Sequence, residues 1–267
     1  MAGTSIYSVY RRTARAAAKQ QVVKKTSNID IKRAQKDFAY FCDVVGGKPP
    51  AEHHMEWHKY LCTGDDSVCL RGIAGPNIDI LAPRGSAKST VLGLYTAWAI
   101  GVHALHKLPL KILYISYTVD VARPKSAAIK RIIEESKNYK EIFPTVKIAK
   151  GINSNEYWSI DWKFAGIKST GEEEFSVCCA GLKGAVTSKR SHLCIIDDAI
   201  KSSDDIKNKD IRQAMEDNWN AVIVPTMFEG ARAICLGTRF RHDDIHARAF
   251  LPSNGWTQII QSAITVD

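Results

Sequence analysis

Short apolar runs alternate along this chain with longer segments in which apolar residues recur every three or four positions. The short runs predict strands buried on both faces, and the longer segments predict helices. The expected strands lie at residues 77–83, 110–116, 175–181, 191–199, 231–239 and 256–264. The expected helices lie at residues 30–45, 51–62, 88–106, 118–137 and 206–222, with a weaker basic helix at 5–25. Because strands and helices alternate, we expect an α/β fold with a mainly parallel sheet and helices on both faces.

Local signals refine two of these segments. Thr118 or Asp120 is expected to cap the helix at 118–137, and Pro124 falls near its first turn. The pattern is less regular from 144 to 190, where residues 156–164 alternate as a strand or a hairpin would.

The basic charge of the chain is concentrated at its N-terminus. The 267 residues have a formal net charge of +9, with 37 basic and 28 acidic side chains. Residues 1–36 contain nine Lys or Arg and one acid, which leaves 28 bases and 27 acids in the rest. We therefore divide the chain into a basic N-terminal extension, 1–36, and a nearly neutral domain, 37–267. The extension suits a polyanionic partner such as nucleic acid, a solvated tail or a transit peptide.

The remaining composition narrows the class of protein. The extension contains no long apolar stretch, so we expect neither a signal peptide nor a membrane span. The seven cysteines are odd in number, and none forms a C-x-x-C pair. Reduced, buried thiols in a cytosol-like compartment fit this pattern best.

The stretch "ILAPRGSAKST", residues 80–90, has the outline of a phosphate-binding loop, or Walker A motif. Lys88 and Ser89 come directly after an expected strand and directly before an expected helix, as such a loop requires. Lys88 would reach the β- and γ-phosphates and the Ser89 hydroxyl would bind Mg²⁺. Backbone N–H groups would surround the phosphates. The expected nucleotide-binding residues are Pro83, Arg84, Gly85, Ser86, Ala87, Lys88, Ser89 and Thr90.

The loop departs from the usual G-x-x-x-x-G-K-[ST] pattern, because Ala82 and Ala87 replace both glycines. Alanine is tolerated where φ is negative, but it costs about 1 kcal/mol or more in the left-handed region. Gly85 is still available inside the turn.

Two acids follow the apolar run "LCII", as in a Walker B motif. In ATPases of this kind, the first acid holds Mg²⁺ and the second polarises the attacking water. Asp197 and Asp198 are the candidates for these two roles. A plain acidic turn after a strand is the alternative, and it becomes less plausible beside the Lys88 loop.

A third strand delivers polar residues to the same edge of the expected sheet. Thr238 and Arg239 follow "AICLG", and ligands of open parallel sheets bind at that edge. Thr238 is a candidate γ-phosphate sensor, with Arg239 or Arg241 responding to it. His242 and His246 lie four positions apart, but the H-E-x-x-H pattern is absent and Asp243 could equally cap a helix, so we do not expect zinc.

These motifs, in this order, resemble the ATPase domain of the large terminase subunit of tailed bacteriophages. The resemblance covers roughly residues 37–264. It rests on "PRGSAKS" (83–89), "ISYTVDVARPKSAAIKRIIE" (115–134), "GAVTSKRSHLCIIDDAIKSSDD" (184–205) and "GARAICLGTRFRHDDIHARAF" (230–250). It implies a P-loop NTPase fold of the ASCE, RecA-like class.

The resemblance also implies roles for individual residues. Arg84 would contact the γ-phosphate, Asp197 would hold Mg²⁺ and Asp198 would be the catalytic acid, although the second acid is more often Glu. Thr238 would lie in the coupling motif. Arg190 is our candidate for an arginine finger that acts on a neighbouring subunit, with Arg239 and Arg241 as rivals. Trp57 or His58, in "PPAEHHMEWHKYL" (49–61), would line the adenine, unless Trp57 belongs to the core.

For the whole protein, the resemblance implies ATP hydrolysis with Mg²⁺, which drives double-stranded DNA into a procapsid. The implied partners are the portal protein, the small terminase subunit and further copies in a ring, in the cytoplasm of an infected bacterium and with no membrane. Because the chain ends soon after the ATPase domain would finish, we expect no nuclease domain within it. The alternatives are another P-loop ATPase, helicase-like or repair-like, and a non-catalytic nucleic-acid-binding module with a degenerate loop. A helicase would need a second RecA-like lobe, for which 267 residues leave no room.

Overall fold

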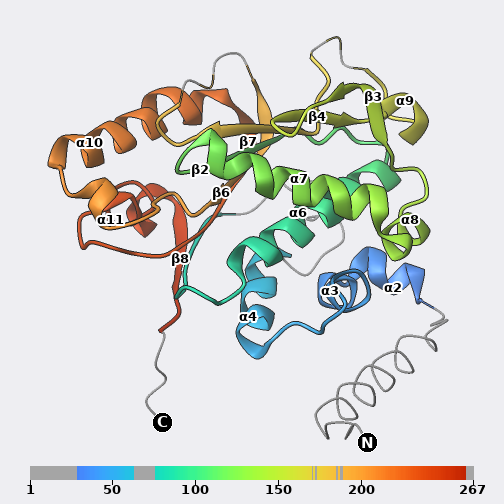
Figure 1. Ribbon diagram of the computed structural model, residues 1–267, viewed down its shortest axis with the longest axis horizontal. Coiled ribbons are helices and arrows are strands. Elements are labelled where there is room, and N and C mark those ends of the chain that lie inside the picture. The colour runs from blue at the N-terminus through green and yellow to red at the C-terminus, as the bar shows by residue number, and fades with distance from the viewer. Residues whose placement is uncertain are drawn as a thin grey trace, which may run out of the picture. The chain divides into compact units, whose positions relative to one another are not determined.

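The computed structural model describes residues 29–62, 76–169, 171, 173–184, 186 and 189–262 (Figure 1). The residues from Ile31 onward belong to one compact unit. The basic helix that we predicted at 5–25, and most of the extension 1–36, lie outside the described residues. None of the helices in the described part of the chain combines the length and the apolar character that a membrane crossing requires.

An eight-stranded sheet forms the centre of this unit, in the order β3-β4-β5-β2-β6-β7-β1-β8. From β5 to β8 the neighbouring strands are parallel, whereas β3 and β4 pair antiparallel with each other and β4 pairs antiparallel with β5. β7 separates β1 from β6, which is the arrangement of the ASCE class. The strands are β1 (Asn77–Leu81), β2 (Ile112–Ser116), β3 (Ile148–Asn153), β4 (Tyr157–Ile160), β5 (Val177–Gly181), β6 (Ser191–Asp197), β7 (Met227–Gly237) and β8 (Trp256–Ile260).

Helices cover both faces of the sheet, as the sequence predicts (Figure 1). On one face, α6 (Lys88–Leu105) contacts β6 and β7, and α7 (Val119–Glu135) contacts β2 and β5. On the other face, alternate residues of β2, β6 and β7 pack with residues of α10 (Lys209–Asn218) and α11 (Ile245–Arg248) in one apolar cluster. The α/β P-loop fold class is therefore confirmed.

α6 is buried over nearly its whole length, because α7 and two N-terminal helices pack around it, and a third accepts the Tyr95 hydroxyl at the Leu61 carbonyl. These helices are α2 (Ile31–Lys36), α3 (Phe38–Gly46) and α4 (Glu52–Leu61), and α8 (Lys137–Ile142) packs beside α2 and α3. Gly101 of α6 lets Phe143 approach closely, since a Cβ at this position would lie 2.4 Å from the ring. α6 therefore holds the loop that precedes it on a rigid, packed element.

Several element boundaries differ from the sequence-based expectation. The helix expected at 30–45 is two helices, because the Asp37 side chain accepts the N–H of Tyr40 and starts α3. β3 was not predicted, because none of its residues is buried and they show no apolar alternation. Thr118, rather than Asp120, caps α7. The remaining short elements are α9 (Trp162–Ala165), η1 (Asp204–Ile206), η2 (Trp219–Ile223), η3 (Val224–Thr226) and η4 (Pro252–Asn254).

A buried arginine of β7 contacts the end of α4 and the segment just before β1. Arg232 is 2% exposed, and its guanidinium donates to the backbone carbonyls of Tyr60, Leu61 and Pro76. These carbonyls lie at the end of α4 and just before β1. The contact fixes α4 against the sheet through backbone carbonyls. No disulfide joins the six cysteines among the described residues.

Candidate active site

In the loop between β1 and α6, the lysine at the end of the loop donates hydrogen bonds to carbonyls at its start. Lys88 is the first residue of α6, is 6% exposed, and its ammonium donates to the carbonyls of Ala82 at 3.1 Å and Pro83 at 2.8 Å. The Ser86 hydroxyl also donates to Pro83 O, at 2.8 Å. Burial is the main cause that lowers the pKa of Lys88, and nearby Asp198 and Asp197 oppose it. The loop therefore presents a desolvated cation at a helix N-terminus, where anions bind readily.

One of the two substituted glycine positions is strained. Ala87, the N-cap of α6, has φ 57° and ψ 26°, which is left-handed backbone, and Gly85 has φ 85°. Ala82 is not among the residues with positive φ. The loop therefore keeps the glycine-type conformation at position 87 although alanine occupies it, at a cost of about 1–2 kcal/mol.

Asp197 ends β6 and is fully buried with both carboxylate oxygens bonded. Its Oδ1 accepts the Ser89 hydroxyl at 2.8 Å, and its Oδ2 accepts the Tyr114 hydroxyl at 2.7 Å. The Lys125 ammonium lies 3.0 Å from Oδ2 and also donates to the Asp197 carbonyl at 3.0 Å. The structure thus joins the loop and the acidic strand, which are separated by more than one hundred residues.

Asp198 follows with φ 54°, a left-handed conformation that turns its half-buried side chain away from the path of the strand. Burial and the neighbouring Asp197 raise the pKa of Asp198, while Lys125, Lys88 and Arg84 lower it. A carboxylate with a raised pKa is a better proton acceptor near neutral pH.

Asp198 lines a cleft of about 380 Å³, at the edge of the sheet where the parallel strands end. Arg84 lies at the edge of this cleft. Its guanidinium donates to Lys201 O at 2.7 Å and lies 5.3 Å from the centre of the Phe240 ring. The cleft is lined by Arg84, Tyr117, Val121, Lys125, Asp198, Ile200, Lys201, Thr238 and Phe240.

Thr238 links the end of β7 to the start of the loop. Its hydroxyl donates to Ala82 O at 3.1 Å, the same carbonyl that Lys88 contacts. Arg239 is exposed and donates to the carbonyls of Arg241 and His242, and Arg241 pairs with Asp243 at 3.2 Å. Of this segment, Thr238 and Phe240 line the cleft and the two arginines do not.

Trp57 and His58 are both buried. Trp57 is 0% exposed and packs edge-on against His53 and His54, so it belongs to the core, which was the alternative for this residue. His58 is also buried, 7% exposed, and packs on Phe38. Both side chains are covered in this structure, and the expectation that one of them lines the adenine stays a prediction.

His54, which the sequence did not single out, supports the loop instead. Its Nδ1 accepts the N–H of Ala51 at 3.2 Å, so in the neutral ring the proton is on Nε2, which donates to Ser86 O at 2.9 Å. Burial is the main cause that lowers the pKa of His54, which favours this neutral form.

Arg190 lies at the opposite end of β6 from Asp197. It is exposed just before the strand begins, with its guanidinium 4.7 Å from the centre of the Phe228 ring. β6 is seven residues long, about 23 Å at 3.3 Å per residue, so Arg190 does not reach the cleft of its own chain. Its assignment as a finger toward a neighbouring subunit stays a prediction.

The two histidines of "HDDIH" are separated. His246 is fully buried, and its Nδ1 lies 2.9 Å from Oδ1 of buried Asp79, while His242 is exposed. Asp244, rather than Asp243, caps α11. Asp79, Cys235 and His246 bring three potential ligand atoms within 4.8 Å of one another, but the short His246–Asp79 contact has the length of a hydrogen bond.

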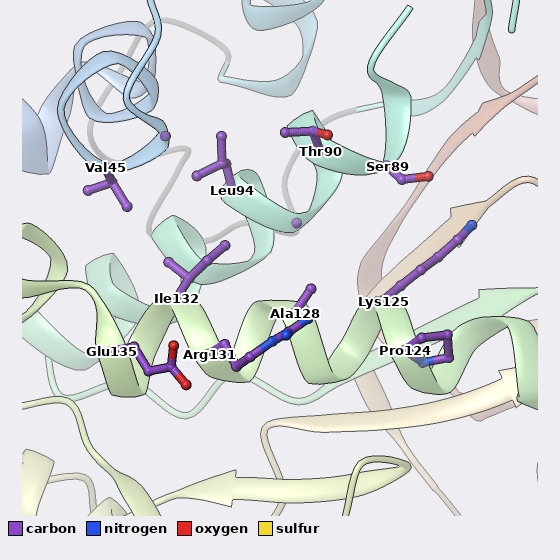
Figure 2. Close-up of a pocket in the computed structure, with 12 residues that line it drawn as sticks. Val45, Ser89, Thr90, Leu94, Pro124, Lys125, Ala128, Arg131, Ile132 and Glu135 are labelled. Carbon is purple, nitrogen blue, oxygen red and sulfur yellow. The ribbon is translucent and has the colours of Figure 1, made fainter. Parts of the chain in front are cut away.

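Lys125 is a second residue at this edge of the sheet that no sequence motif singles out. It also lines a groove of about 700 Å³ between α6 and α7, together with Ser89 and Thr90. Figure 2 shows the Lys125 side chain extending from α7 toward the end of the groove where Ser89 lies. Lys125 lines both the groove and the cleft, so its side chain lies between the two.

The donor set at this edge fits a hard divalent cation. The Ser89 hydroxyl and the Asp197 carboxylate are oxygen groups 2.8 Å apart, and Mg²⁺ prefers oxygen ligands. Lys88 and Arg84 supply the positive charge that phosphate groups require, beside the helix N-terminus.

No protein-family model and no curated protein matches the sequence. Among solved structures, the chain is similar to the large terminase of bacteriophage HK97, with 12% identity and a TM-score of 0.52, over 88% of this chain and 44% of that one. It is also matched to the N-terminal domain of the DNA packaging ATPase from bacteriophage phi29, with 15% identity and a TM-score of 0.39, over 72% of this chain and 93% of that one. The chain thus spans less than half the length of the HK97 protein. The HK97 likeness shows that this chain has the fold of a phage large terminase, which confirms at the level of fold the resemblance seen in the motifs.

Proposed function

We propose that this chain is the ATP-hydrolysing motor domain of a phage large terminase, which drives double-stranded DNA into a procapsid. The contact that carries the proposal is the 2.8 Å hydrogen bond from Ser89 to Asp197, because it joins the phosphate loop to the acidic strand. The fold shared with the HK97 large terminase supports it.

The residues of the cleft divide the work of phosphoryl transfer. Lys88 exchanges its carbonyl contacts for phosphate oxygens, and the loop N–H groups hold the remaining oxygens. Arg84, on the rim, stabilises charge on the transferred group. Asp198 orients a water molecule and accepts its proton, for which its raised pKa suits it.

Ser89 and Asp197 are the residues that would hold Mg²⁺, which supplies charge neutralisation of the phosphates when bound. Thr238 would couple the nucleotide state to β7 through its bond to Ala82 O. The proposed partners are the portal protein, the small terminase subunit and neighbouring copies in a ring, where Arg190 is the proposed finger. The proposed site of action is the cytoplasm of the infected cell.

Hydrolysis by three variants tests the site. Wild type should hydrolyse ATP in the presence of DNA, and Lys88→Ala and Asp198→Asn should each lose about 100-fold or more. Lys130→Ala is a matched control, because the Lys130 ammonium donates to exposed Asn153 and Ser154 and does not line the cleft. Circular dichroism confirms that each variant is folded. Hydrolysis that Lys88→Ala leaves unchanged would contradict the assignment.

Translocation needs its own measurement. The protein should protect DNA from nuclease in a packaging reaction with procapsids and portal, and Asp198→Asn should abolish the protection. DNA-stimulated hydrolysis without packaging would instead favour another nucleic-acid-dependent ATPase.

A further inference from the structure

Lys125 already neutralises the carboxylate that the proposed metal would use. Asp197 is 0% exposed, and a buried carboxylate is costly unless a positive group or several donors compensate it. Ser89 and Tyr114 supply hydroxyl donors, but the described cation in contact with the carboxylate is Lys125, 3.0 Å from Oδ2.

The position of Lys125 leaves its ammonium free to move. Its side chain is 19% exposed and comes from α7, whereas Asp197 is anchored on the sheet by Ser89, Tyr114 and the bond of Ser116 to its carbonyl. Open space borders Lys125 on both sides, in the cleft and in the groove of Figure 2. The ammonium can therefore leave Asp197 without repacking the core.

A divalent cation at Ser89 and Asp197 would bring a second positive group to the same carboxylate. Like charges a few ångströms apart repel strongly in a partly buried site. Asp198, whose pKa Lys125 helps to lower, lies close enough to interact with the ammonium once Asp197 releases it.

We propose that Lys125 is a positioning residue that competes with the divalent cation for Asp197, so that metal binding releases Lys125 and with it the contact that ties α7 to β6. The inference rests on the proposed function. It assigns to α7 a dependence on the metal state, through one ammonium that contacts both the side chain and the carbonyl of Asp197.

Metal affinity in the ADP complex tests this competition, because ADP lacks the γ-phosphate that could attract Lys125 by itself. Mn²⁺ is the probe, and its free concentration is followed by electron paramagnetic resonance with the whole chain and saturating ADP. We expect Lys125→Met to lower the half-saturating Mn²⁺ concentration by about fivefold or more. Lys125→Arg, which keeps the charge, should stay within about twofold of wild type, as should the control Lys130→Met.

Thermal melting gives a second readout. Without metal, Lys125→Met should melt below wild type because Asp197 loses its counter-charge. Mn²⁺ and ADP together should then raise its Tm by more than they raise that of wild type. If Lys125→Met does not fold, Lys125→Gln, which keeps a hydrogen-bond donor, is measured in the same way.

The outcomes separate the two proposals. A Lys125→Met protein that binds Mn²⁺·ADP as wild type does, or more weakly, overturns the competition and makes Lys125 a structural partner of Asp197. Wild type that binds no Mn²⁺·ADP overturns the proposed function, and this inference with it.

Discussion

Two residues other than glycine hold left-handed backbone at the loops that meet in the cleft. Ala87 has φ 57° and Asp198 has φ 54°. Asp tolerates this region better than Ala, because its short polar side chain bonds locally. Strain of this kind persists where the surrounding structure imposes it, and here Lys88 and the packed α6 do so on one side.

The strain at Ala87 makes a stabilising substitution available. Ala87→Gly should raise the free energy of unfolding by about 1 kcal/mol, because relief of about 1–2 kcal/mol exceeds the entropy cost of glycine. Urea unfolding measures the change. Ala82→Gly is the matched control, since Ala82 lacks a positive φ and should lose about 0.5–1 kcal/mol. Equal effects at both positions would contradict the role of backbone conformation.

Asp198 should limit stability at neutral pH. Its folded pKa is raised by burial and by Asp197, so its charged form is less favourable in the folded chain than in the unfolded chain. Asp198→Asn should therefore have a higher Tm than wild type at pH 7–8. The difference should shrink as the pH falls through the raised pKa toward the ordinary value, where both states are protonated. Calorimetry at several pH values measures this, and a less stable Asn variant at pH 8 would argue against it.

The structure brings together candidate residues that stand next to one another in short sequence motifs. Lys88, Ser89 and the two acids stand in short motifs, and the strands that carry them end at the same edge of the sheet. Lys125 and His54 were missed because each meets its partner across a long stretch of chain, 72 residues for Lys125 and 32 for His54. Helical periodicity tells which face of α7 is buried, and it does not tell which side chain reaches Asp197.

At the scale of elements, β7 and α11 are held together by a contact that only glycine permits. A Cβ on Gly237 would lie 2.6 Å from Cε1 and 2.8 Å from Nε2 of His246. The ring cannot easily retreat, because its Nδ1 is bonded to buried Asp79 of β1 and its own backbone lies in α11. The end of β7, the start of the phosphate loop and α11 are thus fixed relative to one another.

Gly237→Ala should destabilise the protein by about 1–3 kcal/mol through overpacking. Gly151→Ala is its control, because a Cβ on Gly151 meets nothing within 4 Å. Urea unfolding of both variants gives the comparison. A Gly237→Ala protein as stable as the control would mean that His246 moves freely.

Helices with a strong apolar pattern were predicted almost to the residue, and exposed elements were not. α6 is observed at Lys88–Leu105 against the expected 88–106. β3 was missed because it pairs through its backbone and buries none of its residues, so it leaves no apolar pattern. The helix expected at 206–222 ends its regular part at Asn218 and continues as a wider turn, η2, because Trp219 and Ile223 both enter the core.

At the scale of the whole molecule, the stability of truncated chains can show where the basic extension ends and the folded domain begins. α2 contributes Ala34, which is 0% exposed and whose carbonyl accepts the Trp98 indole N–H at 3.0 Å. The free energy of unfolding should be about 2–4 kcal/mol lower for a chain that lacks residues 1–36 than for one that lacks only 1–30. The shorter chain has lost the acceptor of the Trp98 indole and the packing of α2. Denaturant unfolding of the two truncated chains compares them, and equal stability would place α2 outside the folded domain.

The chain without residues 1–30 also tests whether the extension binds DNA. It lacks six of the nine basic residues of the extension, Arg11, Arg12, Arg15, Lys19, Lys24 and Lys25. If these side chains neutralise DNA phosphates, the slope of log K against log salt becomes shallower by about 0.9 for each phosphate that the shortened chain leaves unneutralised. An unchanged slope in a filter-binding titration would assign the extension another role.

The burial of Trp57 against His54 determines how this molecule can be observed by its own fluorescence. All six tryptophans are at most 5% exposed, so folded protein should emit at short wavelength and shift to the red on unfolding. None of them lines the cleft. The ring centre of Trp57 is 5.0 Å from that of His54, which is hydrogen-bonded to the phosphate loop. Among the ring contacts of the described residues, no other tryptophan has such a neighbour. Intrinsic emission will therefore report unfolding well, and any change on nucleotide binding should disappear in Trp57→Phe.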